Sequence, residues 1–387
     1  MAPMAPCPPP ASPQAPEHGA ATIRVLVVDD SACVRQALCD ILERDGSMQV
    51  VGQAGSGMEA LAQVKALRPD VVTMDFQMPD MDGIEATRRI MEECPTPIVL
   101  VSAVLNPHEA STVFLALDAG ALTLLEKPRL GDANCGEVVA HLVETVRLMS
   151  EVKVVRRTRR VSLPARDRPV IPEKPGASPA PPAALPEAPT QLPYEILCIG
   201  ASTGGPQALE QLLAGLAPAF PWPVLVVQHI ASGFLQGLVT WLGQTSRLPV
   251  RIAVPGQPLQ GGVVYFAPDK RHMVITRSMT IQLEDSPPEE NVKPAVNKLF
   301  RSCAAVFGRR GVGVLLTGMG RDGATGLQDM KRCGAMTLVQ DKASCIVFGM
   351  PGQAIKIGAA TKVLALQEMA GYLNWLALGR SVPGGAS

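Results

Sequence analysis

The sequence predicts two α/β domains joined by a proline-rich linker, the second doubly wound and mainly parallel with an antiparallel hairpin insertion. Three observations lead to this fold class. A chain of 387 residues is too long for one ordinary domain. Short β-branched runs alternate with segments long enough for a helix, which is typical of parallel sheets covered on both faces. Ten prolines between Pro164 and Pro193 separate the two alternating regions.

Residues 1–21 contain seven prolines and one charged residue, Glu17, and cannot form a hydrophobic core. We expect a disordered tail there. It has neither the basic start nor the apolar segment of a secretory signal, and no part of the chain reaches the roughly 18 apolar residues of a membrane span. We therefore expect a cytoplasmic protein without membrane insertion.

The cysteine content and the net charge argue against further classes of protein. Nine cysteines form no C-x-x-C pair, which favours reduced, buried thiols over disulfides or zinc ligands. The net charge of zero argues against a nucleic-acid binder. Residues 22–147 carry 19 acidic and 10 basic side chains, whereas residues 194–387 carry 11 acidic and 17 basic ones. The opposite charges are compatible with docking of one domain on the other.

The first domain is expected over residues 22–147. Its five strands are predicted from five apolar runs, residues 23–30, 49–54, 70–76, 97–103 and 122–128. A helix fits between each pair of runs, so the strands should form one parallel sheet.

Charged and hydroxyl side chains follow these strands. Asp29 and Asp30 end the first run, Asp75 the third and Ser102 the fourth, and Lys127 follows the fifth. All should meet at the carboxyl edge of the sheet, where doubly wound folds bind ligands. Three carboxylates there suit Mg²⁺, while the hydroxyl and the ammonium group could contact phosphoryl oxygens.

Residues 148–193 form the expected linker. A basic cluster opens it, and we interpret this cluster as a solvated charge run rather than as a regulatory surface: Arg156, Arg157, Arg159 and Arg160. The prolines that follow predict a semi-extended conformation.

The second domain is expected over residues 194–379, followed by a flexible tail at 380–387. Apolar runs at 195–202, 223–230, 312–318 and 336–341 predict parallel strands, and runs at 263–268, 272–277 and 280–285 predict hairpin-like strands. Helices are expected from Pro206, near 236–244 and over 293–307.

The first of these strands leads into Gly200-Ala201-Ser202-Thr203-Gly204, which matches G-x-S-x-G and is followed by Pro206 in the first turn of a helix. Such a turn can expose a nucleophilic serine, and backbone N–H groups at the helix start can bind an oxyanion. A glycine-rich turn after a strand also begins many nucleotide sites. Taken alone, the motif therefore leaves a nucleophile and a phosphate loop equally open.

Two further strand ends favour the nucleophile. His229 follows the second strand and could act as a general base, while Asp322 follows the strand at 312–318 and could orient the imidazole. His272, in the predicted hairpin, is interpreted as a substrate-contact or structural group.

A dinucleotide site is the competing interpretation, because residues 318–323 also read G-x-G-x-x-G, with Asp341 eighteen residues further on. Against it, Asp322 within the loop would repel a pyrophosphate. The order Ser, His, Asp also differs from that of α/β-hydrolases.

The first domain resembles the flavodoxin-like (βα)5 receiver domains of two-component response regulators, on the motifs VVDDS, MDFQMPDMDG, VSA and EKP. The resemblance implies that a histidine kinase phosphorylates Asp75, and that Asp29, Asp30, Asp75 and the backbone carbonyl of Gln77 bind Mg²⁺. One position departs from the family pattern, since Leu124 stands where the fifth strand usually carries Phe or Tyr.

The second domain resembles the catalytic domain of chemotaxis-type protein-glutamate methylesterases. The motifs are GASTGGP, VQHI, FAPDKRHM, PAVNKLF, VLLTGMGRDGATGL and VFGMP. The resemblance implies a nucleophile at Ser202, a base at His229, an orienting acid at Asp322 and an oxyanion donor at the N–H of Met319, with Thr203 as a neighbour.

It further implies cofactor-free hydrolysis of glutamate methyl esters on the cytoplasmic domains of chemoreceptors, deamidation of certain receptor glutamines, and control of both by the receiver. Two alternatives from other classes are a phosphorylation-regulated docking module with an inactive hydrolase domain, and a nucleotide-dependent enzyme that uses the GASTGG or GMGRDG loop.

Overall fold

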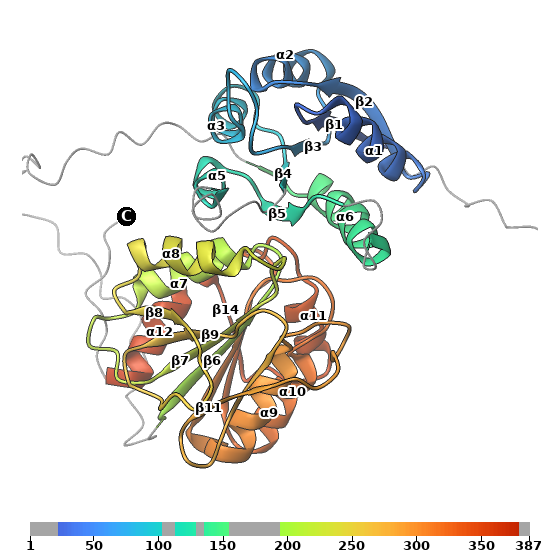
Figure 1. Ribbon diagram of the computed structural model, residues 1–387. Helices are drawn as coiled ribbons and strands as arrows, with labels where there is room; N and C mark the ends of the chain where they lie inside the picture. Colours follow the sequence, from blue (N-terminus) through green and yellow to red (C-terminus); the bar gives the residue numbers. More distant parts are fainter. Residues whose placement is uncertain (1–21, 103–112, 129–134, 155–193, 379–387) are drawn as a thin grey trace, which may run out of the picture.

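The first domain contains a five-stranded, wholly parallel sheet in the order β2-β1-β3-β4-β5 (Figure 1). The computed structural model describes residues 22–102, 113–128, 135–154 and 194–378. The strands are β1 (Ile23–Val28), β2 (Met48–Ala54), β3 (Val71–Met74), β4 (Ile98–Ser102) and β5 (Thr123–Glu126). The predicted receiver-like fold class is confirmed.

Helices cover both faces of this sheet. They are α1 (Ala32–Glu43), α2 (Gly57–Leu67), α3 (Gly83–Glu93), α5 (Leu115–Ala119) and α6 (Cys135–Ser150). Local sequence explains two of the starts, because Ser56 and Asp82 accept hydrogen bonds from backbone N–H groups in the first turns of α2 and α3. The proline-rich tail and residues 155–193, which hold the basic cluster and the prolines of the expected linker, lie outside the described residues. The first residues of the expected linker, 148–150, are the last turn of α6.

The second domain contains a seven-stranded parallel sheet in the order β14-β13-β12-β6-β7-β9-β8. Its strands are β6 (Ile196–Ala201), β7 (Val224–Gln228), β8 (Val250–Ile252), β9 (Val264–Phe266), β12 (Gly311–Leu315), β13 (Met336–Gln340) and β14 (Lys362–Leu364). β10 (His272–Ile275) and β11 (Ile281–Glu284) form a separate antiparallel pair.

Helices lie on both faces of the second sheet (Figure 1). They are α7 (Gly205–Gly215), α8 (Leu235–Thr245), α9 (Val296–Phe307), η1 (Gly308–Arg310), α10 (Ala324–Arg332), α11 (Met350–Lys356) and α12 (Leu366–Leu378). Strands β6, β7 and β12 are fully buried in the centre of the sheet. Their carboxyl ends carry Ser202, His229 and the loop with Asp322.

Two details differ from the sequence-based expectation. The apolar run at 263–268 is not part of a hairpin, because β9 pairs in parallel with β7 and β8 in the main sheet. Helix α9 begins at Val296 rather than at residue 293, since Ala295 is still extended and Pro294 disfavours a helical residue before it.

The two domains contact each other along α5 and the segment that leads into β5 of the first domain, and along α7 and α8 of the second (Figure 1). The rings of Phe114 and Trp241 stack with centroids 5.7 Å apart. Trp241 Nε1 donates a hydrogen bond to Asp118 at 3.2 Å. Gln207 Nε2 donates to the backbone carbonyls of residues 121 and 122, both at 3.1 Å.

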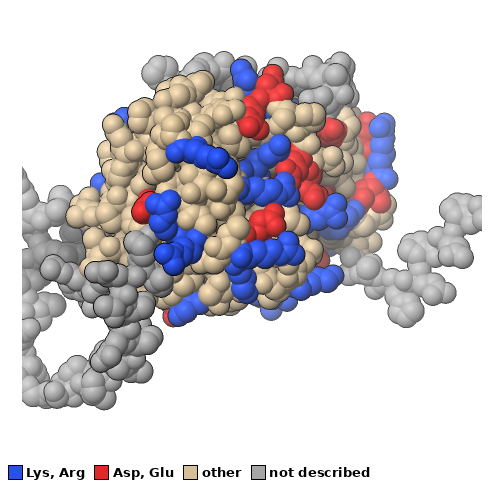
Figure 2. All heavy atoms as spheres, turned by 90° about the horizontal axis from the view of Figure 1, so that it is seen from below, with Lys and Arg blue, Asp and Glu red and all other residues tan. Residues whose placement is uncertain are grey.

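On the face turned away from the first domain, Lys and Arg outnumber Asp and Glu (Figure 2). This agrees with the basic excess counted in the second half of the chain. None of the described helices is long and apolar enough to cross a membrane. The cysteine side chains that the structure describes are free thiols: Cys33, Cys39, Cys94, Cys198, Cys303, Cys333 and Cys345.

Candidate active site

Ser202 lies in the turn between β6 and α7, at the carboxyl edge of the second sheet. It is 8% exposed. Its backbone N–H donates to the carbonyl of Thr317 at 3.0 Å, and its own carbonyl accepts from Gly205 N–H at 2.7 Å. These bonds fix the turn against β12, so the serine is held on rigid elements.

His229 and Asp322 meet at the same edge. His229 directly follows β7, and its Nε2 lies 2.9 Å from Asp322 Oδ2. The exposed fractions of the two side chains are 13% and 4%. The pairing expected from the two strand ends is therefore present in the structure.

The carboxylate of Asp322 is held from several directions. Its Oδ2 accepts from Val296 N–H at 2.6 Å, and its Oδ1 accepts from Asn297 N–H at 3.0 Å and Gly323 N–H at 2.8 Å. Two of these donors are the first N–H groups of α9, which favour a negative charge. No phosphate is needed to satisfy these donors, which weakens the nucleotide-loop interpretation.

Burial by itself raises the pKa of Asp322. The hydrogen bond and charge of His229, together with the N–H groups of Asn297 and Val296, outweigh burial and lower this pKa below its usual value. Asp322 therefore stays ionised at neutral pH and can stabilise a positive charge on the imidazole.

The hydroxyl of Ser202 forms no hydrogen bond with His229 among the described contacts. The two residues are nevertheless adjacent, because His229 N–H donates to the carbonyl of Ala201 at 2.9 Å. Since Nε2 is bonded to Asp322, Nδ1 is the ring nitrogen left to accept a proton from a nucleophile.

Met319 lies in the loop after β12, next to Ser202. The loop comes close because Gly318 has no side chain, and a Cβ there would lie 2.7 Å from Ser202 Cβ. Within the described ranges, the backbone N–H of Met319 donates no hydrogen bond. It is thus a free donor beside the serine, as an oxyanion site requires.

His272 is buried, and both of its ring nitrogens form hydrogen bonds within the protein, so neither is available to a substrate. Its Nδ1 accepts from Ala295 N–H at 3.1 Å and its Nε2 donates to the Pro287 carbonyl at 3.0 Å. Of the two roles expected for it, the geometry supports the structural one. By fixing Ala295, it also fixes the start of α9, which holds Asp322.

Two buried residues were missed by sequence reasoning. Thr317 donates from its hydroxyl to the carbonyl of Thr203 at 2.9 Å. Gln228, the last residue of β7, donates to the carbonyls of Ser202 and His229, both at 2.8 Å. The sequence feature that could have identified Gln228 is a polar side chain at the end of an otherwise apolar strand.

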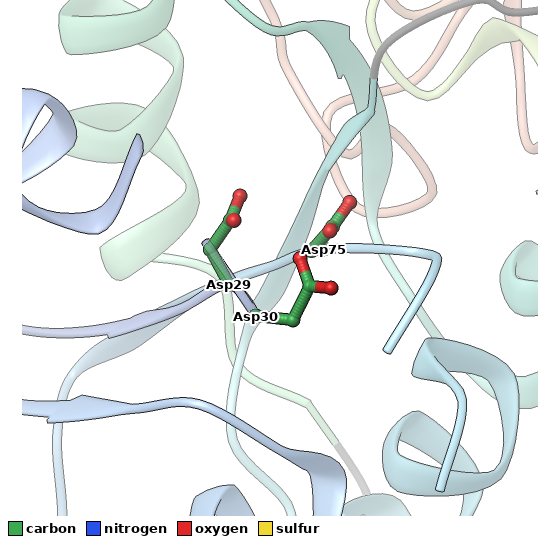
Figure 3. Close-up of side chains that lie close together, drawn as sticks. All are labelled: Asp29, Asp30 and Asp75. Atoms are coloured by element: carbon green, nitrogen blue, oxygen red, sulfur yellow. The ribbon is translucent and has the colours of Figure 1, made fainter. Parts of the chain in front are cut away.

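The first domain brings its three aspartates together at the expected edge (Figure 3). Oxygen atoms of Asp29, Asp30 and Asp75 lie within 4.8 Å of one another. Lys127 Nζ lies 2.7 Å from Asp29 Oδ2 and 2.8 Å from Asp75 Oδ2.

Electrostatics in this cluster are strongly coupled. Burial raises the pKa of Asp75 above its usual value, although the hydrogen bond and charge of Lys127 oppose the rise. For Lys127, burial lowers the pKa, but the two carboxylates outweigh it and keep the ammonium group charged.

The remaining expected residues lie around this cluster. Ser102 is buried at the end of β4. Gln77 lines an open hollow beside Asp30, together with Phe76, Met78, Pro79 and Asp82. Leu124 is half-buried and packs against the hydrophobic core, so no aromatic ring is available there to change rotamer.

Helix α6 brings His141 of the first domain towards His229. Partial desolvation of His141 lowers its pKa, Glu144 raises it and the charge of His229 lowers it, although the residue is still exposed at the surface. Val347 of the second domain joins the hydrophobic core of the first domain, and Met319 and Ile346 pack against this shared cluster. The first domain therefore lies over the edge that carries Ser202.

Comparison with known proteins yields two family matches. Residues 197–373 match the family model described as CheB methylesterase, and residues 25–133 match the response regulator receiver domain.

Two similar proteins match over most of this chain. The chain is 46% identical to protein-glutamate methylesterase/protein-glutamine glutaminase 4 of Geobacter metallireducens, over 92% of this chain and 99% of that protein. It is 47% identical to protein-glutamate methylesterase/protein-glutamine glutaminase 3 of Hahella chejuensis, over 91% of this chain and 98% of that protein. The crystal structure of the Thermotoga maritima CheB methylesterase catalytic domain is 36% identical, covers 47% of this chain and 98% of that one, and has a TM-score of 0.46.

Proposed function

This chain belongs to the protein-glutamate methylesterase/protein-glutamine glutaminase family, and we propose that it hydrolyses glutamate γ-methyl esters on chemoreceptors under the control of its receiver domain. By the same chemistry it deamidates specific receptor glutamines. Its substrates are the methylated cytoplasmic domains of these receptors, so it acts in the cytoplasm.

Ser202 is the nucleophile. Its Oγ attacks the γ-carbonyl carbon of the methylated glutamate, while His229 accepts the hydroxyl proton at Nδ1. The tetrahedral intermediate collapses to a glutamyl ester of Ser202, and the same proton leaves with the methoxy group as methanol. Water, activated by His229, then releases the glutamate. For a glutamine substrate the group that departs is ammonia.

The observation that carries this proposal is the hydrogen bond of 2.9 Å between His229 Nε2 and Asp322 Oδ2 beside Ser202. It supports one tautomer, with the proton on Nε2 and Nδ1 free to act as a base. The lowered pKa of Asp322 supports its role as a permanent anion that stabilises the imidazolium. Met319 N–H stabilises the oxyanion.

The receiver domain supplies the regulation. Asp75 accepts a phosphoryl group from a histidine kinase. The oxygens of Asp29, Asp30 and Asp75, with the carbonyl of Gln77, fit the hard-oxygen preference of Mg²⁺, which would neutralise negative charge during phosphorylation. Ser102 and Lys127 contact the phosphoryl oxygens.

Contacts between the domains support inhibition by docking. Gln207, next to the nucleophile turn, bonds to the receiver backbone, and Met319 packs against the hydrophobic cluster that Val347 shares with the receiver core. We infer that phosphorylation shifts the population away from this docked arrangement and opens the site to the receptor.

The Ser202→Ala variant tests the catalytic assignment. We expect methanol release from methylated receptor membranes to fall by several orders of magnitude, because members of a triad act as a unit. Mass spectrometry of receptor peptides would report the lost esterase and deamidase reactions at each site. Ser278→Ala, in the turn between β10 and β11, is the matched control and should retain activity. Undiminished methanol release by Ser202→Ala would refute the proposal.

A further inference from the structure

Gln228 connects the two residues proposed as nucleophile and base. It is the last residue of β7 and is 4% exposed, so its carboxamide lies inside the protein. Its Nε2 donates to the backbone carbonyl oxygens of Ser202 and His229, both at 2.8 Å. Both amide protons are therefore used to join these two backbones.

The orientation of this carboxamide is unambiguous, because both neighbours are carbonyl oxygens and can only accept. Its Oε1 has no hydrogen-bond partner among the described residues. That oxygen lies against Gly205, where any Cβ would collide with it. Since a buried unpaired oxygen costs free energy, the stabilising interactions of this amide come from its nitrogen.

The hydrogen bond from Gln228 to the Ser202 carbonyl also orients the Ser202–Thr203 peptide, which matters for catalysis. In a planar trans peptide, the carbonyl of Ser202 and the N–H of Thr203 point in opposite directions. The carbonyl of Ser202 accepts from Gly205 N–H at 2.7 Å within the turn and from Gln228 Nε2 at 2.8 Å, and the second bond holds it towards β7. The N–H of Thr203 must then face the other side of β6, where β12 and the Met319 loop lie.

Within the described ranges, Thr203 N–H donates no hydrogen bond. The hydroxyl of Thr317 also donates to the next carbonyl, that of Thr203, at 2.9 Å. Thr203 N–H is therefore a free donor in a fixed turn. It faces the side on which the other free donor, Met319 N–H, lies.

We propose that Gln228 is a positioning residue of the hydrolysis. It holds the Ser202–Thr203 peptide with its N–H directed to the Met319 side and keeps the backbone of His229 beside it. Thr203 N–H and Met319 N–H then stabilise the tetrahedral oxyanion together. This inference rests on the proposed roles of Ser202 and His229.

Gln228→Met tests the proposal, because methionine keeps the length of the side chain and has no donor. We expect kcat to fall about 10²-fold or more, as for the loss of one oxyanion donor, with little change in KM. Labelling of Ser202 by a fluorophosphonate should slow in parallel.

Thr337→Val is the matched control for a lost buried hydrogen bond. Thr337 is fully buried, and its hydroxyl donates to the Ala359 carbonyl at 2.7 Å, at the opposite end of the sheet. This variant should lose stability but retain the wild-type labelling rate. Wild-type labelling by folded Gln228→Met would overturn the proposal.

Gln228→Glu gives a second readout that a purely structural role would not produce. A protonated glutamate keeps one donor, whereas its carboxylate has none, and burial raises its pKa. The ratio of variant to wild-type activity should therefore fall as pH rises from about 5 to 8. A flat ratio would contradict the inference, even if Gln228→Met failed to fold. Activity in Ser202→Ala would instead refute the proposed function.

Discussion

At the scale of single residues, Asp322 both stabilises the start of α9 and orients the imidazole of His229. Its Oδ2 accepts from both His229 and Val296 N–H, so one oxygen links the imidazole to the start of α9. The orientation of the base thus depends on a helix distant in sequence. Replacing this oxygen should affect both stability and catalysis.

We predict that Asp322→Asn lowers kcat by about 10³-fold to 10⁴-fold, because an amide nitrogen at the Oδ2 position would face two donors and release the imidazole from its tautomer. Steady-state methanol release measures the loss. Asp329→Asn, on α10 and paired with Arg301 and Arg332, is the matched control and should remain active. A loss below tenfold for Asp322→Asn would show that this carboxylate does not orient the base.

Gly318 sets the distance between the Met319 loop and the nucleophile. A Cβ at this position would lie 2.7 Å from Ser202 Cβ and 3.1 Å from Ser202 N, and would also collide with Met350. We therefore predict that Gly318→Ala displaces the loop and lowers kcat about 10²-fold, since a shift of about 1 Å in a reacting group has such effects.

Gly371→Ala is the control for Gly318→Ala. Gly371 lies on the exposed side of α12, with no atom within 4 Å of its added Cβ. This change should leave kcat unaltered and stabilise the fold by about 0.5–1 kcal/mol through helix propensity. Thermal unfolding and ester hydrolysis measured on both variants separate the two effects. Full activity in Gly318→Ala would mean that the loop tolerates displacement.

Sequence alone located the residues that follow strands, because parallel topology brings strand ends to one edge. Ser202, His229 and Asp322 were found in this way. Gln228 was not, since its role depends on which carbonyl oxygens its amide reaches. His272 stayed ambiguous for the same reason: only its buried bonds to Ala295 and Pro287 distinguish a structural from a substrate-binding role.

At the scale of elements, long buried strands were predicted well and short ones poorly. β6, β7, β12 and β13 have continuous apolar runs that leave little choice of structure. β8 and β14 have three residues each and lie at the edges of the sheet, where alternation is too brief to give a signal. β9 was assigned to a hairpin because its neighbours in sequence are β10 and β11, whereas its partners in space are β7 and β8.

At the scale of the whole molecule, the docked interface contains unfavourable as well as favourable contacts. Phe114 and Trp241 stack, but Glu210 on α7 lies within the electrostatic influence of Asp118 on α5. Burial raises the pKa of Glu210, and the charge of Asp118 raises it further. An interface that includes such a pair is weakened at neutral pH, as expected for the inhibitory contact that we propose phosphorylation releases.

The sign of the pH effect follows from this raised pKa. The docked state binds a proton at Glu210 more tightly than the released state, so docking strengthens as pH falls through the raised pKa and weakens as pH rises above it.

We predict that Glu210→Gln tightens docking at neutral pH, because the amide removes the repulsion from Asp118. Basal methanol release should fall a few-fold, and the activation produced by acetyl phosphate with Mg²⁺ should increase by a similar factor. The difference from wild type should shrink as pH falls, because Glu210, whose pKa is raised, then becomes protonated. Glu368→Gln, an exposed position on α12, makes the same charge change away from the interface and should behave as wild type. Asp75→Asn should abolish activation in both backgrounds. If Glu210→Gln raised basal activity instead, the contact between α5 and α7 would not restrain the catalytic site.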